Sequence, residues 1–388
     1  MVAKKKKKIY DTVKAMQKIY ETQEKPKKAF LVSILDSSRD HAKAAELQGL
    51  CETLGLVIAA HDKIRVRERS PRFGMGSGKA EELSKKAAEL EADLIVFDWN
   101  PNPSQQRNWE ELSGLPVIDR QELIIRIFAE RATTREAELQ VKLAELTYLL
   151  PRLTHKYIDL SRQRGGRYGT KGSGETKLET DRRKIEKRIH LLEDEIKQVR
   201  KQRQQQRRQR ERSNIPVCAI VGYTNAGKSS LLNALTGADV LAQDKLFCTL
   251  DAVTRRFEPA LGVPVLLTDT VGFIRNLPHS LIKAFHSTLE EAALASILIH
   301  ILDASDPEIE NNYETTISVL KELNAHEIPM ITLLNKIDCL PADGESTILE
   351  DLKNRFPDSI AVSVKTGTAI DMLKEKIVSM VTSYRDRP

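Results

Sequence analysis

Gly222-Tyr223-Thr224-Asn225-Ala226-Gly227-Lys228-Ser229 is the stretch that decides the fold of the C-terminal part of this chain. It matches the phosphate-loop pattern G-x-x-x-x-G-K-[ST], in which glycines allow backbone N–H groups to surround phosphate oxygens. Lys228 adds a positive charge near the β- and γ-phosphates, and the hydroxyl of Ser229 is placed to bind Mg²⁺. The string therefore predicts a nucleotide-binding P-loop domain.

Three further strings follow it in a fixed order: Asp269-Thr270-Val271-Gly272, Asn335-Lys336-Ile337-Asp338 and Ser363-Val364-Lys365. The carboxylate of Asp338 can accept two donors from the edge of guanine, a pattern that adenine lacks. Backbone N–H groups of the last string can bind the guanine oxygen. Together the four strings predict a GTP-binding site, with GTP or GDP as the bound nucleotide.

Short apolar runs precede these strings at residues 217–221, 263–268, 297–302 and 330–334, with helical stretches at 229–235 and 309–323 between them. Apolar runs of this length are typical of buried parallel strands. We therefore predict a doubly wound, mainly parallel α/β sheet with the ligand loops at the carboxyl ends of its strands.

Residues 29–118 alternate in the same way, with strand-like runs at 30–35, 56–60, 94–97 and 117–118 and helical stretches at 41–54 and 80–90. This pattern predicts a second, smaller α/β domain. Its Gly74-Met75-Gly76-Ser77-Gly78-Lys79 only partly resembles a phosphate loop, because Phe73 and Ala80 stand where Gly and Ser or Thr are needed. We interpret the string as a glycine turn, with a phosphate or RNA contact as the alternative.

Two apolar stripes at helical spacing lie between these domains. Leu139, Leu143, Leu146 and Leu150 form the first, and Ile185, Ile189, Leu192, Ile196 and Val199 form the second. They predict an antiparallel helical hairpin, with Pro151 kinking or ending its first helix and residues 201–212 continuing as a polar helix or linker.

The tip of this hairpin, residues 164–175, combines glycines with Arg164, Arg167, Lys171 and Tyr168. Glycines permit close backbone approach to a surface, while basic and aromatic side chains can contact phosphates and stack on bases. Residues 151–213 hold 20 Lys and Arg against nine Asp and Glu, an excess larger than the +6 of the whole chain. Both features favour RNA as a partner of the hairpin over a simple mobile connection.

The composition argues against metal-binding, disulfide-rich and membrane-spanning classes of protein. Four widely spaced cysteines and eight scattered histidines indicate neither a zinc ribbon, a disulfide framework nor a metal cluster. No apolar run approaches the roughly 18–20 residues that a membrane span needs. We expect a soluble, cytoplasmic monomer whose lysine-rich start (Lys4 to Lys8) is a solvated tail.

Five strings outside the GTPase motifs carry a resemblance that extends over about residues 30–388: Ser104-Gln105-Gln106-Arg107-Asn108, Ile118-Asp119-Arg120, Leu149-Leu150-Pro151-Arg152-Leu153, Gly172-Ser173-Gly174-Glu175 and Asp181-Arg182-Arg183. A sixth, Phe247-Cys248-Thr249-Leu250-Asp251, stands where switch I belongs. With them the chain resembles the HflX family of ribosome-associated GTPases. It departs from the family pattern at Ser173, Lys177, Cys248 and Ala252, where Pro, Gln, Ala and Pro are usual.

The resemblance implies binding to the 50S ribosomal subunit and to 70S ribosomes, with splitting of stalled ribosomes and with the glycine-rich tip reaching toward the peptidyl transferase centre. Thr249 of switch I would join Ser229 as a Mg²⁺ ligand in the GTP state, and Asp269 would bind the ion through water. Lys228, Thr249 and Gly272 are the expected catalytic groups, Gly272 through its N–H to the γ-phosphate.

The residue after Gly272 is Phe273, where many GTPases carry a glutamine that orients the attacking water. Phenylalanine cannot orient water, so we expect slow intrinsic hydrolysis that the ribosome accelerates.

The predicted domains are a basic extension (1–28), an α/β domain (29–125), the hairpin (126–213) and the GTP-binding domain (214–388). A ribosome-assembly GTPase, an RNA-binding module regulated by nucleotide, and ATP use by the N-terminal domain are the alternatives.

Overall fold

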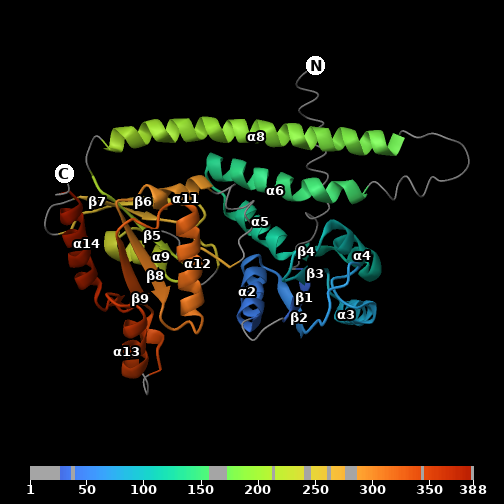
Figure 1. Ribbon diagram of the computed structural model, residues 1–388, viewed down its shortest axis with the longest axis horizontal. Helices are drawn as coiled ribbons and strands as arrows, with labels where there is room; N and C mark the ends of the chain where they lie inside the picture. The colour runs from blue at the N-terminus through green and yellow to red at the C-terminus, as the bar shows by residue number, and fades with distance from the viewer. Residues whose placement is uncertain are drawn as a thin grey trace, which may run out of the picture.

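Two α/β units lie side by side in this computed structural model, and a pair of long helices runs across both of them (Figure 1). The structure describes residues 27–35, 40–156, 173–211, 215–239, 246–259, 264–275, 286–341 and 345–385. The lysine-rich start of the chain and the glycine-rich residues 164–172 lie outside these ranges. Within them, no helix has the length and apolar character that crossing a membrane requires.

The first unit alternates strands and helices as predicted. Its sheet is wholly parallel, in the order β2-β1-β3-β4. Strand β1 is almost entirely buried, as expected for a strand covered by helices on both faces. Its elements are β1 (Lys28–Ile34), α2 (Asp40–Thr53), β2 (Val57–Ile64), α3 (Ser77–Glu89), β3 (Leu94–Phe97), α4 (Pro103–Ser113), β4 (Val117–Asp119) and α5 (Arg120–Arg131).

The glycine string of this unit forms a turn that leads into α3. Gly74 has φ of +76°, and its N–H donates to the carbonyl of Ser70 over 2.9 Å. Met75 packs into the core, and α3 begins at Ser77. The string thus forms a glycine turn, while a phosphate or RNA contact at this turn stays an alternative prediction.

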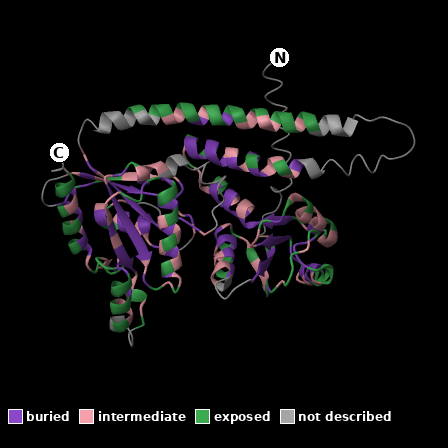
Figure 2. Cartoon of the chain, in the orientation of Figure 1, coloured by how far each residue is buried: buried purple, intermediate pink, exposed green. Residues whose placement is uncertain are grey.

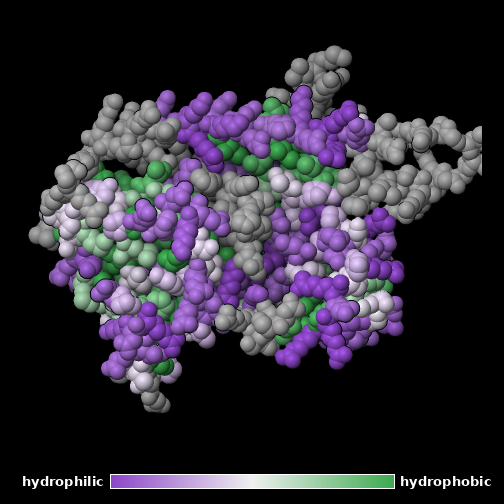
Figure 3. Space-filling model, viewed as in Figure 1, coloured by the Kyte–Doolittle hydropathy of each residue, from purple (hydrophilic) through white to green (hydrophobic). Residues whose placement is uncertain are grey.

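Helices α6 (Arg135–Lys156) and α8 (Ser173–Glu211) run antiparallel along the two units (Figure 1). Their predicted stripes, apart from Leu150, meet in a separate apolar cluster, with hydrophilic residues on the outer side of α8 (Figure 3). Helix α6 continues past Pro151 to Lys156, so of the two predicted effects, a kink or an end, the end was wrong and the kink stays a prediction. The members of the cluster are Leu139, Leu143, Leu146, Ile185, Ile189, Leu192, Ile196 and Val199.

The second unit has a six-stranded sheet in the order β10-β9-β8-β5-β7-β6, parallel except for the edge strand β6. The four predicted strands are present, as are both predicted helices. Its elements are β5 (Val217–Gly222), α9 (Lys228–Thr236), β6 (Val253–Phe257), β7 (Val265–Asp269), α11 (His286–Ala293), β8 (Ile297–Asp303), α12 (Ile309–Glu322), β9 (Met330–Asn335), the 3₁₀ helix η1 (Ile337–Cys339), α13 (Glu345–Arg355), β10 (Ile360–Ala361) and α14 (Ile370–Arg385).

The apolar cores of the two units are continuous at one place. The rings of Phe128, on α5, and Phe247 pack edge to face with centroids 4.7 Å apart. Both side chains are almost fully buried, and they belong to one cluster that also contains Leu31 of β1 and Val221 of β5. The buried residues of the two sheets stand out in Figure 2, where the outer helix α8 is largely exposed. The loop that carries Phe247 is thus packed against the first unit.

Candidate nucleotide-binding site

The loop between β5 and α9 needs glycine at two positions, because of its backbone conformation and its close packing. Gly222 and Gly227 have φ of +154° and +105°. A Cβ atom on Gly222 would lie 2.3 Å from the carbonyl oxygen of Ile301, and one on Gly227 would lie 2.4 Å from Nδ2 of Asn335. At Gly222 the contact is with backbone and leaves no room for a side chain, whereas at Gly227 a side chain would displace the amide of Asn335. The two glycines of the motif are therefore required by close packing as well as by φ.

Lys228 begins α9, and its amine is buried beneath this loop. Its Nζ donates to the carbonyl oxygens of Tyr223 and Gly222 over 2.7 and 3.2 Å. Burial lowers the pKa of Lys228 to about 8, although the charge of Asp269 acts in the opposite direction. Among the described residues the hydrogen-bond partners of this buried ammonium are carbonyl oxygens, so an anionic ligand would stabilise its charge.

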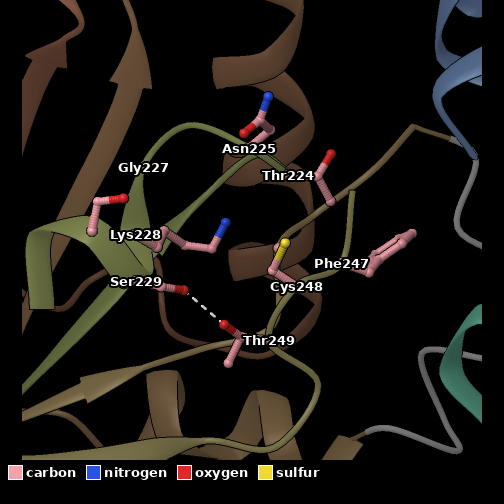
Figure 4. A pocket seen from close by; sticks show the side chains of 10 residues that line it. Thr224, Asn225, Gly227, Lys228, Ser229, Phe247, Cys248 and Thr249 are labelled. Atoms are coloured by element: carbon pink, nitrogen blue, oxygen red, sulfur yellow. Dashed lines mark hydrogen bonds between the residues drawn. The ribbon is translucent and has the colours of Figure 1, made fainter. Parts of the chain in front are cut away.

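Three oxygen atoms converge beside Lys228. Oδ2 of Asp269 lies 2.6 Å from Oγ of Ser229 and 3.0 Å from Oγ1 of Thr249, and the two hydroxyls are 2.7 Å apart (Figure 4). Three contacts share only two hydroxyl protons. The other oxygen of Asp269, Oδ1, is buried and has no partner among the described residues. This donor set fits Mg²⁺, which prefers carboxylate, hydroxyl and water oxygens.

Gly272 and Phe273 close the site on the side of β7. A Cβ atom on Gly272 would lie 2.9 Å from Nζ of Lys228 and 2.8 Å from Cγ2 of Thr224, so only glycine fits. The N–H of Phe273 donates to the carbonyl of Gly222, and its own carbonyl accepts from the N–H of Thr224. The ring of Phe273 is 1% exposed and lies in the apolar cluster that also contains Phe247. At the position of the usual glutamine there is thus a core residue.

The loops predicted to read guanine are joined to the phosphate loop by Asn335. Its Nδ2 donates to the carbonyl of Ala226 over 2.9 Å, and its Oδ1 accepts from the N–H of Val364 over 3.1 Å. The hydroxyl of Ser363 donates to Asp338 over 2.6 Å, and this bond is the main cause that lowers the pKa of the Asp338 carboxyl. Asp338 is exposed and ionised, so it can accept donors from a base.

A pocket of about 400 Å³, its open mouth included, gathers many of the predicted residues (Figure 4). The sequence pattern omitted one lining residue, Ser230, which follows the motif. The pocket is lined by Thr224, Asn225, Gly227, Lys228, Ser229, Ser230, Phe247, Cys248, Thr249 and Gly272.

Other predicted residues lie near the pocket but serve the scaffold. The side chains of Ala226, Leu250 and Val271 are buried in apolar clusters. Thr270 donates its hydroxyl to the carbonyl of Ile220 over 2.7 Å. Lys336 forms an ion pair with Asp303 over 2.7 Å, Ile337 packs in a small apolar cluster, and Lys365 is exposed beside Asp338.

Two predicted residues are bonded to parts of the chain outside the second unit. The hydroxyl of Tyr223 donates to Glu46 of α2 and accepts from the N–H of Arg275 over 3.0 Å. Asp251 accepts hydrogen bonds from Thr133 and Thr134, which precede α6. Sequence reasoning missed these partners.

Arg120, which opens α5, completes the contact around Tyr223. This side chain is 4% exposed and forms ion pairs with Glu46 and Asp98, the latter over 3.2 Å. It also donates to the carbonyl of Arg275 over 3.5 Å. The phosphate loop and the segment after Gly272 are thus both fixed to a buried ion pair of the first unit.

Comparison with protein families gives three matches along the chain. Residues 41–129 match the family described as "GTP-binding GTPase N-terminal", residues 131–210 match "GTP-binding GTPase Middle Region", and residues 217–336 match "50S ribosome-binding GTPase". Among curated proteins, "GTPase HflX" of Akkermansia muciniphila is 47% identical, covering 94% of this chain and 87% of the relative. The protein of the same name from Escherichia coli K12 is 43% identical, covering 80% and 72%.

Among solved structures, a complex of SsGBP with GDP matches with a TM-score of 0.51 at 26% identity, covering 92% of this chain and 99% of the other. The order of family matches follows the order of the first unit, the helical pair and the second unit. The comparisons therefore agree with an α/β GTP-binding fold, and they cover nearly the whole chain.

Proposed function

This chain belongs to the HflX family of GTPases, and from that premise we propose that its GTP cycle controls binding to the large ribosomal subunit and the splitting of 70S ribosomes. The observation that supports the ribosomal partner most directly is the match of residues 217–336 to the family described as "50S ribosome-binding GTPase". The pocket beside Lys228 supports the nucleotide half of the proposal.

We assign the surface that meets ribosomal RNA to the ends of the helical pair. In the middle of α8 the charges are balanced locally, for example by the ion pairs of Arg182 with Glu186 and of Lys197 with Asp194. Residues 200–212 hold seven Lys and Arg against one Glu, and residues 162–171 add further basic residues. A basic excess of this kind in the sequence favours a polyanion such as RNA.

The chemistry follows from the groups around Lys228. The lysine amine and backbone N–H groups of the loop would neutralise charge that develops on the phosphates, and the N–H of Gly272 would contact the γ-phosphate. Ser229 and Thr249 would hold Mg²⁺ directly and Asp269 through water. The ion, when bound, neutralises charge on the β- and γ-oxygens. Asp338, Asn335 and residues 363–365 would select guanine.

Slow hydrolysis in the free protein follows from the burial of Phe273. The ring cannot orient a water molecule, and its main chain is bonded to Gly222 and Thr224. A ribosomal partner would have to order the site or supply the missing group, and a group supplied in this way contributes about 10³–10⁵-fold elsewhere.

Two measurements test the proposal. Single-turnover GTP hydrolysis is followed with and without 50S subunits, and we expect a large acceleration by the subunits; rapid hydrolysis by the free protein would contradict the expectation.

Sedimentation of 70S ribosomes with the protein and GTP, a non-hydrolysable analogue or GDP tests splitting. We expect dissociation with both triphosphates but not with GDP. Equal ribosome binding in all three states would instead indicate an RNA-binding module that ignores the nucleotide.

A further inference from the structure

Residues 246–251 form a strip with two different sides. One side turns toward the pocket: Cys248 and Thr249 line it, and Thr249 contacts Ser229 and Asp269. The other side is bonded to the first unit and to the start of α6. Since consecutive residues of one short strip serve both sides, a displacement of Thr249 necessarily strains the contacts on the other side.

The contact at the end of the strip is the most extensive. The carboxylate of Asp251 accepts from the N–H groups of Thr133 and Thr134, each over 3.1 Å. It also accepts from both hydroxyls, that of Thr133 over 2.7 Å. Hydrogen bonds to an ionised acceptor are about twice as strong as neutral ones. One carboxylate thus receives four donors from two consecutive residues.

Thr134 is the N-cap of helix α6. Its carbonyl accepts from the N–H of Glu138 over 2.9 Å, and its hydroxyl oxygen accepts from the N–H of Ala137 over 3.2 Å. The same hydroxyl donates its proton to Asp251, so the cap is oriented by the carboxylate. A negative charge at a helix N-terminus is also favoured by the helix dipole. Asp251 therefore holds the first turn of the inner hairpin helix.

The opposite end of the strip is fixed as well. The N–H of Leu246 donates to Oγ1 of Thr53 over 3.2 Å, and the ring of Phe247 packs on Phe128. Phe247 has φ of +56°, an uncommon conformation for an aromatic residue. The strip is therefore held at both ends with Thr249 between them, and it cannot move as a free loop.

We infer that Asp251 is a positioning residue that couples the γ-phosphate site to the helical hairpin. While Asp251 caps α6, Thr249 is held beside Ser229 and Asp269. Withdrawal of Thr249 from the pocket pulls the carboxylate away from Thr133 and Thr134 and loosens the base of the hairpin. The inference deepens the proposed function and depends on it, since it names the contact through which nucleotide state changes the affinity for 50S subunits.

The test removes the donors on the hairpin side, away from the pocket. In the double variant Thr133→Val and Thr134→Val the β-branched shape and the backbone N–H groups remain, while both hydroxyls are lost. We expect its affinity for GDP and for a GTP analogue to stay within about threefold of the wild type, since neither residue lines the described pocket. The ratio of 50S affinities between triphosphate and diphosphate forms should fall by at least about fivefold, the lower end of typical coupling.

The reciprocal variant Asp251→Asn removes the charge on the other side of the contact and should reduce the same ratio. Combining it with the threonine changes should add little, because all of them break one contact. Asp239→Asn is the matched control: this exposed aspartate precedes the strip, and its loss should leave the ratio at the wild-type value.

Hydrogen exchange at residues 134–140 provides a readout that needs no ribosome. Protection there should differ between the GDP and GTP-analogue forms of the wild type and should cease to differ in the double threonine variant. If the wild-type protein bound 50S subunits equally well in its triphosphate and diphosphate forms, a ratio of one, the proposed function would be overturned. A wild-type ratio above one that the threonine variant retains, together with unchanged nucleotide-dependent protection, would overturn the role of Asp251 alone.

Discussion

At the scale of single residues, the nucleotide site contains a buried positive charge that destabilises the nucleotide-free protein. Lys228 is 6% exposed, and burial lowers its pKa from the usual 10.5 to about 8. Between those two values the unfolded chain binds more protons than the folded one, so the stability of the nucleotide-free protein rises with pH in that window. Below pH 8 the full penalty for burying the ammonium remains.

Replacing Lys228 by Met should therefore stabilise the nucleotide-free protein at pH 7 while it abolishes tight GTP binding. We expect a gain of about 1–3 kcal/mol, from a pKa displacement worth about 1.4 kcal/mol per unit, and a smaller gain at pH 10. Urea unfolding at both pH values and GDP titration calorimetry measure the two effects. Lys353→Met, an exposed change on α13, is the control; a destabilised Lys228→Met variant would contradict the prediction.

Asp338 gives a second prediction at this scale. Asp338→Asn removes the ionised acceptor that Ser363 orients and should weaken GDP binding by about 1.5–3 kcal/mol, the usual worth of a hydrogen bond to a charged group. Binding of xanthine nucleotides, which present the opposite donor pattern, should improve. Competition against a fluorescent GDP analogue measures both. Asp358→Asn is a suitable control, because this exposed residue has φ of +64°, which Asn tolerates; equal losses in both variants would refute the assignment.

At the scale of elements, the helical pair has its own small core. The cluster on α6 and α8 contains four buried apolar side chains and is separate from the cores of both sheets. Helix α8 has 39 residues, far more than its contacts with α6 cover. Its folding therefore depends on few contacts, and it should open without unfolding of either α/β unit.

The variant Leu192→Ala should show that the helical pair can open while both α/β units stay folded. The side chain is fully buried, and its truncation should cost about 2–5 kcal/mol within the hairpin. Hydrogen exchange should accelerate in α8 and the facing part of α6, whereas GDP affinity should not change. Leu191→Ala is the adjacent control, since Leu191 is 47% exposed. Loss of nucleotide binding in Leu192→Ala would show that the elements unfold together.

At the scale of the whole molecule, the two α/β units are joined by buried polar contacts as well as by an apolar one. Arg120 lies between Glu46 and Asp98, and burial raises the pKa of Asp98 to about 6 against the effect of Arg120. Glu46 in turn contacts Tyr223 in the phosphate loop. Such a buried network is costly to interrupt because each remaining charge loses its partner.

Arg120→Met should therefore lower the free energy of unfolding by about 3–5 kcal/mol. Acidification toward pH 5 should recover part of the loss, because protonation of Asp98 removes one uncompensated charge. Arg131→Met, in the last turn of the same helix, is the control. Chemical denaturation at pH 5 and pH 7 measures the effect; a loss that is the same at both pH values would contradict the role of Asp98.

The sequence predicted the parts of this architecture that local patterns encode. Buried parallel strands are continuous apolar runs, so β5, β7, β8 and β9 were recognised. Strand β6, with sequence Val-Thr-Arg-Arg-Phe, was missed because its exposed edge positions are charged, and β10 has only two residues. The site motifs were recognised because their spacing is fixed within one loop.

What the sequence could not predict are contacts between distant segments. Asp251 and Thr133 are 118 positions apart, and Tyr223 and Glu46 are 177 apart. No local period or propensity relates such pairs, so their side chains were assigned to the nucleotide. The domain boundaries and the roles of individual site residues stay predictions.

The length of the inner helix has a mechanical consequence. Helix α6 has 22 residues, which corresponds to about 33 Å of rise, and it is held at its first turn by a residue two positions from Thr249. Its other end is also tied to the first unit, because Arg152 forms an ion pair with Asp119 over 2.8 Å and donates to Gln106 over 2.9 Å. A change on the scale of one hydrogen bond beside the phosphates therefore acts on a long helix that is anchored at both ends, and it is passed along that helix to the first unit.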